Sequence, residues 1–208
     1  QFNLVKNYKL RTQLVEDRAK NVIVERTAEE LVKTGLPQFY VYHLVKIQQF
    51  YQEQLHIPLD QFRLYQLDDK EKAFYNKYHF DIEIELHELG WTEMGGLHYR
   101  TDHDLCGHQR VSTESMEVLE EDTGQKFIPH VLEISLGVDR SVYALLDLNY
   151  EDNKERGNII LHLPSVLTPF VCAVFPLVKN KPEIVAKAEE VYSAIKKQFS
   201  CFWDESGS

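Results

Sequence analysis

A carboxylate and a hydroxyl stand two residues apart in the segment KFIPHVLEISLGVDR, Lys126–Arg140. The apolar and β-branched residues around them, between Gly124 and Gly137, predict a short buried strand. In a strand, Glu133 and Ser135 point to the same face. A carboxylate that accepts hydrogen bonds would therefore face the same space as a hydroxyl.

A cation follows this predicted strand at once. Gly137 permits a tight turn, and the apolar spacing after it predicts a helix whose first turn contains Arg140. Helix N-termini bind anions through their backbone N–H groups, so the combination suits a pocket for a nucleotide and an amine. The simpler alternative is a core strand with one buried salt bridge between Glu133 and Arg140.

Two further strands are predicted upstream. Residues 80–86 alternate apolar and acidic side chains, and residues 91–99 return after a turn at Gly90, which predicts an antiparallel pair. The glycine pair at residues 95–96 predicts a bulge or a close approach of a ligand to the backbone. The polar residues expected to converge on one face of this sheet are Glu93, Arg100, Asp102, Glu133, Ser135, Asp139 and Arg140.

The rest of the chain predicts flanking helices and a second unit. A capping box begins a short helix at Thr27, and an apolar stripe predicts a longer helix over residues 38–55. Beyond Thr168 the order changes to strand, helix, strand, which predicts a domain boundary there. The remaining predicted strands are residues 62–67, 159–163, 171–177 and 200–203, and the last helix is 182–199. Residues 3–15 are expected to be irregular strand and loop, and residues 111–125 and 149–158 are expected to be loops.

Composition narrows the function classes. The chain has 208 residues and a formal charge of −10, which argues against nucleic-acid binding over its whole surface, because such binding depends on neutralising phosphates. No apolar run approaches the length of a membrane span, and no targeting peptide is evident. Three cysteines, far apart along the chain, imply no disulfide framework and fit a reducing cytosol.

Other chemistries receive little support. No phosphate-binding glycine loop or nucleophile elbow occurs. A zinc-binding module is a weak alternative, since its spacing is poor and no distal pair of ligands matches it. Its residues would be His98, His103, Cys106 and His108.

Three segments together resemble glycyl-tRNA synthetases of the dimeric class II type, most closely their archaeal and eukaryotic branch. They are GWTEMGGLHYRTDHDL, KFIPHVLEISLGVDR and LPSVLTPFVCAVFPLVKN. The resemblance implies an α+β fold, with the C-terminal part of a class II catalytic domain over residues 1–167. That part would contain an antiparallel sheet, flanking helices and a helical insert at about 27–78. Residues 168–208 would begin an α/β anticodon-binding domain.

The resemblance also implies residue roles for glycine binding. Glu133 would form a salt bridge with the α-ammonium of glycine, Ser135 would help to hold it, and Arg100 would bind the carboxylate side. Gly137 would complete this pocket. A crowded pocket would reject a larger amino acid by steric clash.

For ATP, GVDR resembles class II motif 3. Arg140 would contact the γ-phosphate and pack on adenine, with Gly137, Val138 and Asp139 completing the motif. Glu93 with Met94 would face ATP, with Glu93 acting through Mg²⁺. The implied cofactors are ATP and Mg²⁺.

The implied activity is formation of glycyl-adenylate and transfer of glycine to tRNA(Gly), in a cytoplasmic homodimer without membrane contact. Motifs 1 and 2 are absent and are expected before Gln1, so the 208 residues alone are predicted not to activate glycine. The alternative is a non-catalytic class II relative, such as an accessory subunit of a mitochondrial DNA polymerase. The combination of Glu133, Ser135 and Arg140 argues against that alternative, because a scaffold needs no ammonium-binding carboxylate.

Overall fold

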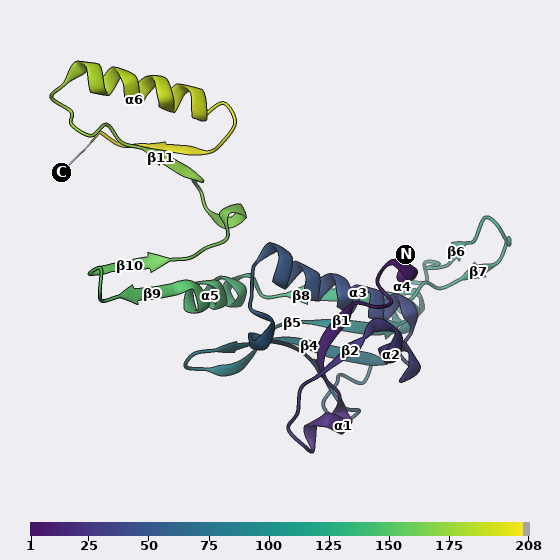
Figure 1. Ribbon diagram of the computed structural model, residues 1–208. Coiled ribbons are helices and arrows are strands. Elements are labelled where there is room, and N and C mark those ends of the chain that lie inside the picture. The colour runs from purple at the N-terminus through teal and green to yellow at the C-terminus, as the bar shows by residue number, and fades with distance from the viewer. Residues whose placement is uncertain (206–208) are drawn as a thin grey trace. The chain divides into compact units, whose positions relative to one another are not determined.

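The computed structural model describes residues 1–205, which form two compact units. Within the described residues the first unit is Gln1–Leu161 and the second is 162–205 (Figure 1). Within residues 1–205 no helix is both long enough and apolar enough to cross a membrane.

The first unit is built on a six-stranded sheet in the order β2-β1-β3-β4-β5-β8. Its neighbouring strands are antiparallel except for the parallel pair β1 and β3. The strands are β1 (Lys9–Gln13), β2 (Val24–Thr27), β3 (Phe62–Gln66), β4 (Tyr78–Leu86), β5 (Gly90–Thr101) and β8 (Val131–Leu136). The predicted β4–β5 pair is confirmed, and β1 lies in a stretch where irregular strand and loop were predicted.

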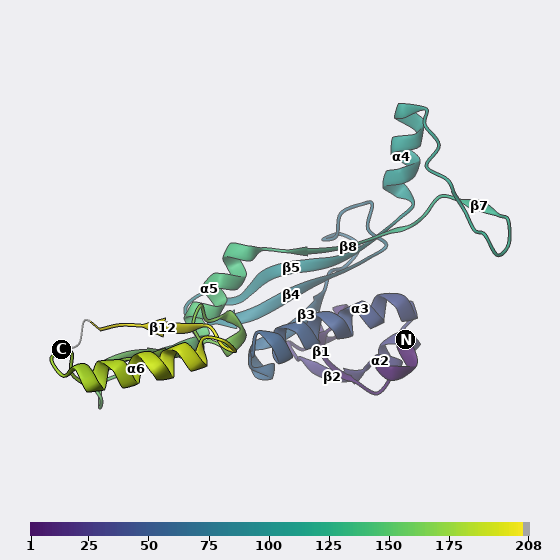
Figure 2. The same cartoon turned by 90° about the horizontal axis from the view of Figure 1, so that it is seen from above.

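One face of this sheet carries the hydrophobic core. Apolar side chains of β4 alternate inward, and α3 (Gln38–Gln49), extended by a π-helical turn at Phe50–Gln54, lies beside the sheet in Figures 1 and 2. The Tyr40 hydroxyl donates to the Leu97 carbonyl at 2.7 Å, which ties α3 to β5. The predicted capping box is confirmed, since Thr27 caps α2 (Ala28–Lys33) and Glu30 returns the hydrogen bond.

Two segments, each with a helix and a β-hairpin, extend from opposite ends of β5 and β8 (Figure 2). One end leads into α4 (His103–Ser112) and a hairpin of β6 (Val118–Leu119) and β7 (Lys126–Phe127). The other leads into α5 (Val138–Asn149) and a hairpin of β9 (Tyr150–Asn153) and β10 (Asn158–Leu161).

Two predictions in this region are wrong. Residues 150–153 pair as a strand instead of forming a loop. The strand that contains Glu133 is also not a buried one. It begins at Val131 and forms the edge of the sheet, where Ile134 is 46% exposed, because no described strand pairs with its outer side.

The second unit has the predicted strand-helix-strand order. β11 (Cys172–Val174) and β12 (Cys201–Trp203) pair in parallel, and α6 (Pro182–Ile195) connects them. A parallel pair requires a long crossover, which the helix supplies. A 3-10 turn at Ser165–Leu167 precedes the unit's first strand.

Candidate functional site

The sheet face opposite α3 is polar, and β4, β5 and β8 bring the predicted residues onto it. Residues that are paired across neighbouring strands lie on the same face of the sheet. Each set of paired residues therefore forms a row that runs across the strands. The rows are His79, His98 and Glu133; Asp81, Gly96 and Ser135; and Glu83 with Glu93. We call this surface the open face.

Glu133 binds Arg100 and not Arg140. Arg100 donates to the Glu133 carboxylate and, through Nη2, to Asp104 Oδ1 at 2.9 Å. Its guanidinium carbon also lies 4.4 Å from the centre of the Tyr75 ring. The simpler alternative, a salt bridge between Glu133 and Arg140, is therefore wrong. Because β5 lies beside β8, Arg100 is the nearer cation.

This ion cluster is partly shielded from water. The side chain of Arg100 is 25% exposed and that of Glu133 is 37% exposed. Hydrogen bonds to Asp104 and then to Glu133 raise the pKa of Arg100 above its already high usual value. The cluster thus offers a fixed cation and a fixed anion side by side.

Ser135 lies on the open face beside Gly96, as the alternation of β8 predicts. The two glycines allow close packing within the sheet. A Cβ at Gly95 would lie 2.1 Å from the Ser135 carbonyl oxygen, so β5 and β8 meet too closely for a side chain there. The predicted bulge is confirmed by a register shift between Ile82 and Glu83 opposite this segment.

Two histidine rings occupy the space over Gly96. A Cβ at Gly96 would lie 2.7 Å from His98 Nε2 and 3.0 Å from His79 Nε2. The ring centres are 4.0 Å apart, and Asn76 Nδ2 lies 3.3 Å from His98 Nδ1 and 3.4 Å from His79 Nδ1. The Asn76 amide nitrogen is therefore within hydrogen-bond distance of the Nδ1 atoms of both rings.

Sequence reasoning had not assigned this pair of rings to the site. His79 and His98 are nineteen residues apart, and only strand pairing brings them together. Burial, followed by the nearby His79, lowers the pKa of His98. His98 is therefore neutral at pH 7 and forms the floor of the open face between Gly96 and Glu133.

The second predicted cation, Arg140, contacts the other half of β5 from the neighbouring helix α5. Arg140 stands in the first turn of α5 as predicted, where Nη1 donates to the Glu93 carbonyl at 2.9 Å and lies 3.3 Å from Glu93 Oε2. The cross-strand neighbour of Glu93 is Glu83, which accepts from Arg63 Nε at 2.5 Å. Burial raises the pKa of Glu83, although Arg63 opposes this effect.

The motif around Arg140 borders a cleft of about 290 Å³ between α5 and the β4–β5 hairpin. Its lining includes Asp139 and Arg140, together with apolar side chains. Met94 also lines it but is 1% exposed, and its carbonyl accepts the Gly137 N–H at 2.7 Å. Val138 is 74% exposed.

Gly137 does not adopt the left-handed conformation that only glycine tolerates easily. Its φ is −83°, which any residue can adopt. A Cβ there would lie 3.3 Å from the Met94 carbonyl oxygen and 3.4 Å from Arg140 Cδ. The reason for glycine is therefore close packing at the junction and not the tight-turn conformation.

The residues of the alternative zinc reading are divided between two elements. His98 lies on β5, whereas His103, Cys106 and His108 belong to α4. Cys106 Sγ donates to Asp102 Oδ2 at 3.5 Å, and burial raises the pKa of this thiol. Among residues 1–205 no group of three or more His, Cys, Asp or Glu side chains is arranged to hold a metal ion.

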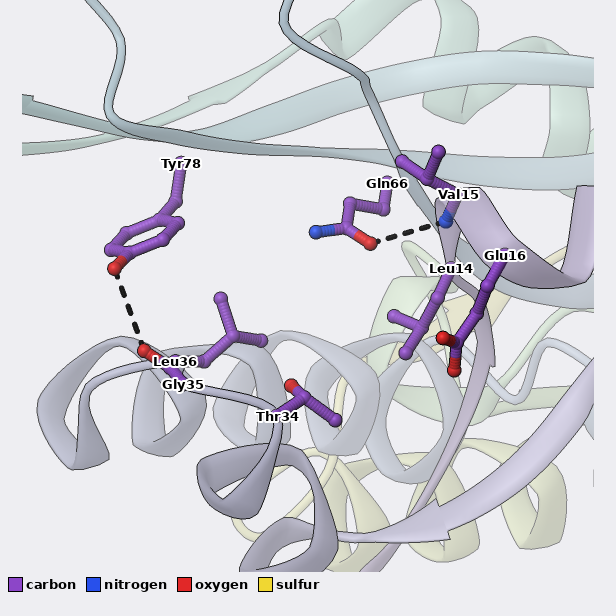
Figure 3. Close-up of a pocket in the computed structure, with 8 residues that line it drawn as sticks. All are labelled: Leu14, Val15, Glu16, Thr34, Gly35, Leu36, Gln66 and Tyr78. Carbon is purple, nitrogen blue, oxygen red and sulfur yellow. Dashed lines mark hydrogen bonds between the residues drawn. The ribbon is translucent and has the colours of Figure 1, made fainter.

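A larger cavity, of about 530 Å³, lies between the α2–α3 turn and one end of the sheet (Figure 3). None of the predicted site residues lines it. The Tyr78 hydroxyl donates to the Gly35 carbonyl, and the Val15 N–H donates to Gln66 Oε1, so these polar groups are already paired (Figure 3). Glu16 is the one charged residue among its lining residues.

The mainly antiparallel sheet with flanking helices is compatible with a class II aminoacyl-tRNA synthetase. Comparison with known proteins identifies the particular family. The chain is 36% identical over 157 residues to a glycine–tRNA ligase of Lachnoclostridium phytofermentans, and 41% identical over 142 residues to one of Clostridium acetobutylicum. By sequence it belongs to the glycyl-tRNA synthetase family. No family model matches the chain.

These matches cover unequal shares of the proteins. The first covers 74% of this chain and 33% of the Lachnoclostridium protein, and the second covers 67% and 30%. A glycine–tRNA ligase of Pyrococcus horikoshii is 29% identical over 286 aligned positions, which cover 100% of this chain and 50% of that protein. The matches thus span between 30% and 50% of the length of these relatives.

Proposed function

We propose that the protein carrying this chain ligates glycine to tRNA(Gly) through glycyl-adenylate. The observation that carries the proposal is the arrangement along β5. Glu133, Ser135 and Arg100 gather at one end of the open face, and Glu93 and Arg140 pair at the other end. Membership of the glycyl-tRNA synthetase family supports it.

The Arg100–Glu133 pair suits a zwitterion. Glycine carries an ammonium and a carboxylate two bonds apart, and the pair presents one charge of each sign at hydrogen-bond distance. In this proposal Glu133 and Ser135 hold the ammonium, and Arg100 faces the carboxylate. Charge-assisted hydrogen bonds of this kind are about twice as strong as neutral ones.

The histidine rings on the open face favour the smallest amino acid. The His98 and His79 rings occupy the space over Gly96, and His98 is the cross-strand partner of Glu133, so in this proposal the rings restrict the room for a substrate side chain. A clash discriminates against a larger substrate more strongly than a pocket that merely fits it loosely. We assign His98 to glycine selection on this ground.

At the other end, Arg140 is suited to an exchangeable anion. Its side chain is 56% exposed and that of Glu93 is 50% exposed, so a phosphate can replace the carboxylate as the partner of Arg140. The cleft beside Asp139 and Arg140 has apolar walls, which favour a purine base. Gly137 and Val138 would complete the nucleotide side at the start of α5.

Mg²⁺ fits this end as well. The ion is usually held by one or two carboxylates together with substrate phosphates, and Glu93 stands beside Glu83 in the sheet. Of the two, Glu93 is the candidate ligand, because Glu83 is bound to Arg63. Bound Mg²⁺ would compensate phosphate charge; whether Met94 contacts ATP stays a prediction.

The chemistry follows from positioning. The glycine carboxylate attacks the α-phosphorus of ATP, and pyrophosphate leaves. A hydroxyl of the terminal ribose of tRNA(Gly) then attacks the carbonyl carbon of glycyl-adenylate, and AMP leaves. Fixing the two reactants converts a bimolecular step into an effectively unimolecular one, and charge compensation lowers the barrier further. A homodimer and a cytoplasmic location are also proposed for the whole protein.

Glycine-dependent exchange of pyrophosphate into ATP tests the proposal with the full-length protein. Exchange that requires glycine and Mg²⁺, followed by charging of tRNA(Gly), is the expected result. No exchange, together with binding of nucleic acid, would support the accessory-subunit alternative instead.

A further inference from the structure

Two cysteines that are far apart in sequence lie opposite each other in the second unit. Cys172 opens β11, Cys201 opens β12, and the two are direct partners in the parallel register. Paired residues on neighbouring strands share a face, and the strands are about 4.8 Å apart. Disulfides form across Cα separations of about 4.4–6.8 Å, so the backbone already holds the pair at a suitable distance.

The surroundings of the two thiols are different. Cys201 is 8% exposed, whereas Cys172 is half-buried. Their sulfur atoms also contact backbone carbonyls, Cys172 Sγ at 3.8 Å from Ser200 O and Cys201 Sγ at 3.6 Å from Phe202 O. Burial, followed by hydrogen bonding to Cys172, raises the pKa of Cys201. The register thus places the two thiols on neighbouring strands as direct partners, and the more accessible one is Cys172.

We propose that Cys172 and Cys201 are a reversible disulfide site, whose oxidant is a small disulfide such as glutathione disulfide. This revises the expectation drawn from sequence, where cysteine spacing implied no disulfide. In a reducing compartment such pairs are usually transient or redox-sensing. The proposal concerns the second unit alone and does not depend on the proposed ligase activity.

The reaction balances in two exchange steps. The Cys172 thiolate attacks one sulfur of glutathione disulfide, which forms a mixed disulfide and releases one glutathione thiolate. The Cys201 thiolate then attacks Cys172 Sγ, which forms the protein disulfide and releases the second glutathione. The two cysteines are oxidised, glutathione disulfide is reduced, and the two thiol protons end on the released glutathione molecules.

Closing this bond would tie the two ends of the α6 crossover together. A disulfide stabilises a folded unit mainly by restricting the unfolded chain. The oxidised second unit should therefore melt at a higher temperature than the reduced one, and a reductant should reverse the change.

Thiol counting on the purified chain tests the proposal. The fully reduced protein has three free thiols, and incubation with glutathione disulfide should leave one. Intact mass should fall by about 2 Da, the mass of two hydrogens, and proteolysis should yield a linked pair of peptides containing Cys172 and Cys201.

Two variants serve as controls. Cys106→Ser should still lose two thiols, because that cysteine lies in the first unit. Cys201→Ser should stop at a mixed disulfide between glutathione and Cys172. The proposal is overturned if the unaltered chain retains all three thiols, stops at the mixed disulfide, or forms only links between molecules.

Discussion

The two ends of the open face use the same chemistry in different ways. At the α4 end, Arg100 binds Glu133 and Asp104 and stacks on Tyr75. At the α5 end, Arg140 has one carboxylate partner and one backbone carbonyl. The side chain of Arg100 is 25% exposed and that of Arg140 is 56% exposed.

This difference indicates two kinds of ligand. A pocket that selects glycine by excluding a Cβ needs fixed walls, and side chains locked by several partners provide them. A site for ATP must release pyrophosphate, and an exposed ion pair exchanges partners at low cost because water screens both charges. We therefore propose that the rigid end binds the amino acid and the exposed end binds the nucleotide.

Removing the anion of the rigid end should have the largest effect. Glu133→Ala is expected to lower glycine-dependent ATP–pyrophosphate exchange about 10³-fold or more, the scale of a lost hydrogen-bonded charge partner in a binding site. Circular dichroism should show an intact fold. Glu29→Ala, on α2 and away from the open face, is the matched control; near-normal exchange by Glu133→Ala would remove Glu133 from this role.

Removing the cation of the exposed end should have the next largest effect. Arg140→Ala is expected to cost about 2–4 kcal/mol of transition-state stabilisation, measured as kcat/KM for ATP. Arg140→Lys should recover part of it, since the charge remains but the planar fork is lost. Arg156→Ala in the β9–β10 turn is the control, and an unchanged kcat/KM for Arg140→Ala would refute the assignment.

Removing the His98 ring should change the selectivity between amino acids more than the rate of exchange with glycine. His98→Ala opens space over Gly96 and is expected to reduce the preference for glycine over alanine about 10–200-fold, the range for one methylene group. Exchange measured with each amino acid gives the ratio. His43→Ala, on α3 at the other face of the sheet, should leave it unchanged; equal ratios in both variants would contradict the role of His98.

Without any ligand, replacing the two arginines should change the free energy of unfolding by different amounts. Arg100→Ala leaves Glu133 and Asp104 without their shared cation and should lower the unfolding free energy by about 1–2 kcal/mol. Arg140→Ala should change it by less than about 0.5 kcal/mol, as is usual for exposed pairs. Urea denaturation of both variants measures the difference, and equal values would mean that the two ends do not differ in rigidity.

Lowering the pH should slightly reduce the free energy of unfolding, through protonation of His98. The pKa of His98 is lower in the folded chain than in the unfolded one, so between these values the unfolded state binds more protons. The stabilising contribution of neutral His98 is complete above about pH 6.5, the usual pKa of histidine. It is lost as the pH falls through the pKa that His98 has in the folded chain. His98→Asn should lose less stability than the unaltered chain between pH 7.5 and 5.5, and identical losses would contradict the lowered pKa.

Local patterns predicted much of this molecule because their causes are local. The alternation of residues 80–86, the capping box at Thr27 and the start of a helix before Arg140 all appear in the structure. The pairing of charges could not be read in this way. Glu133 binds Arg100, thirty-three residues away, because β8 lies beside β5, and sequence distance alone favoured Arg140.

The sequence by itself determined which residue types are present at the site and which local elements hold them: a carboxylate and a hydroxyl on one strand face, and an arginine at the start of a helix. Only the tertiary structure decided which groups touch. Strand order placed Arg100 on Glu133, two histidines over Gly96, and Cys172 opposite Cys201. The physical reason is that side-chain direction follows from a two-residue period, whereas partnership depends on the register between strands that meet only after the chain has folded.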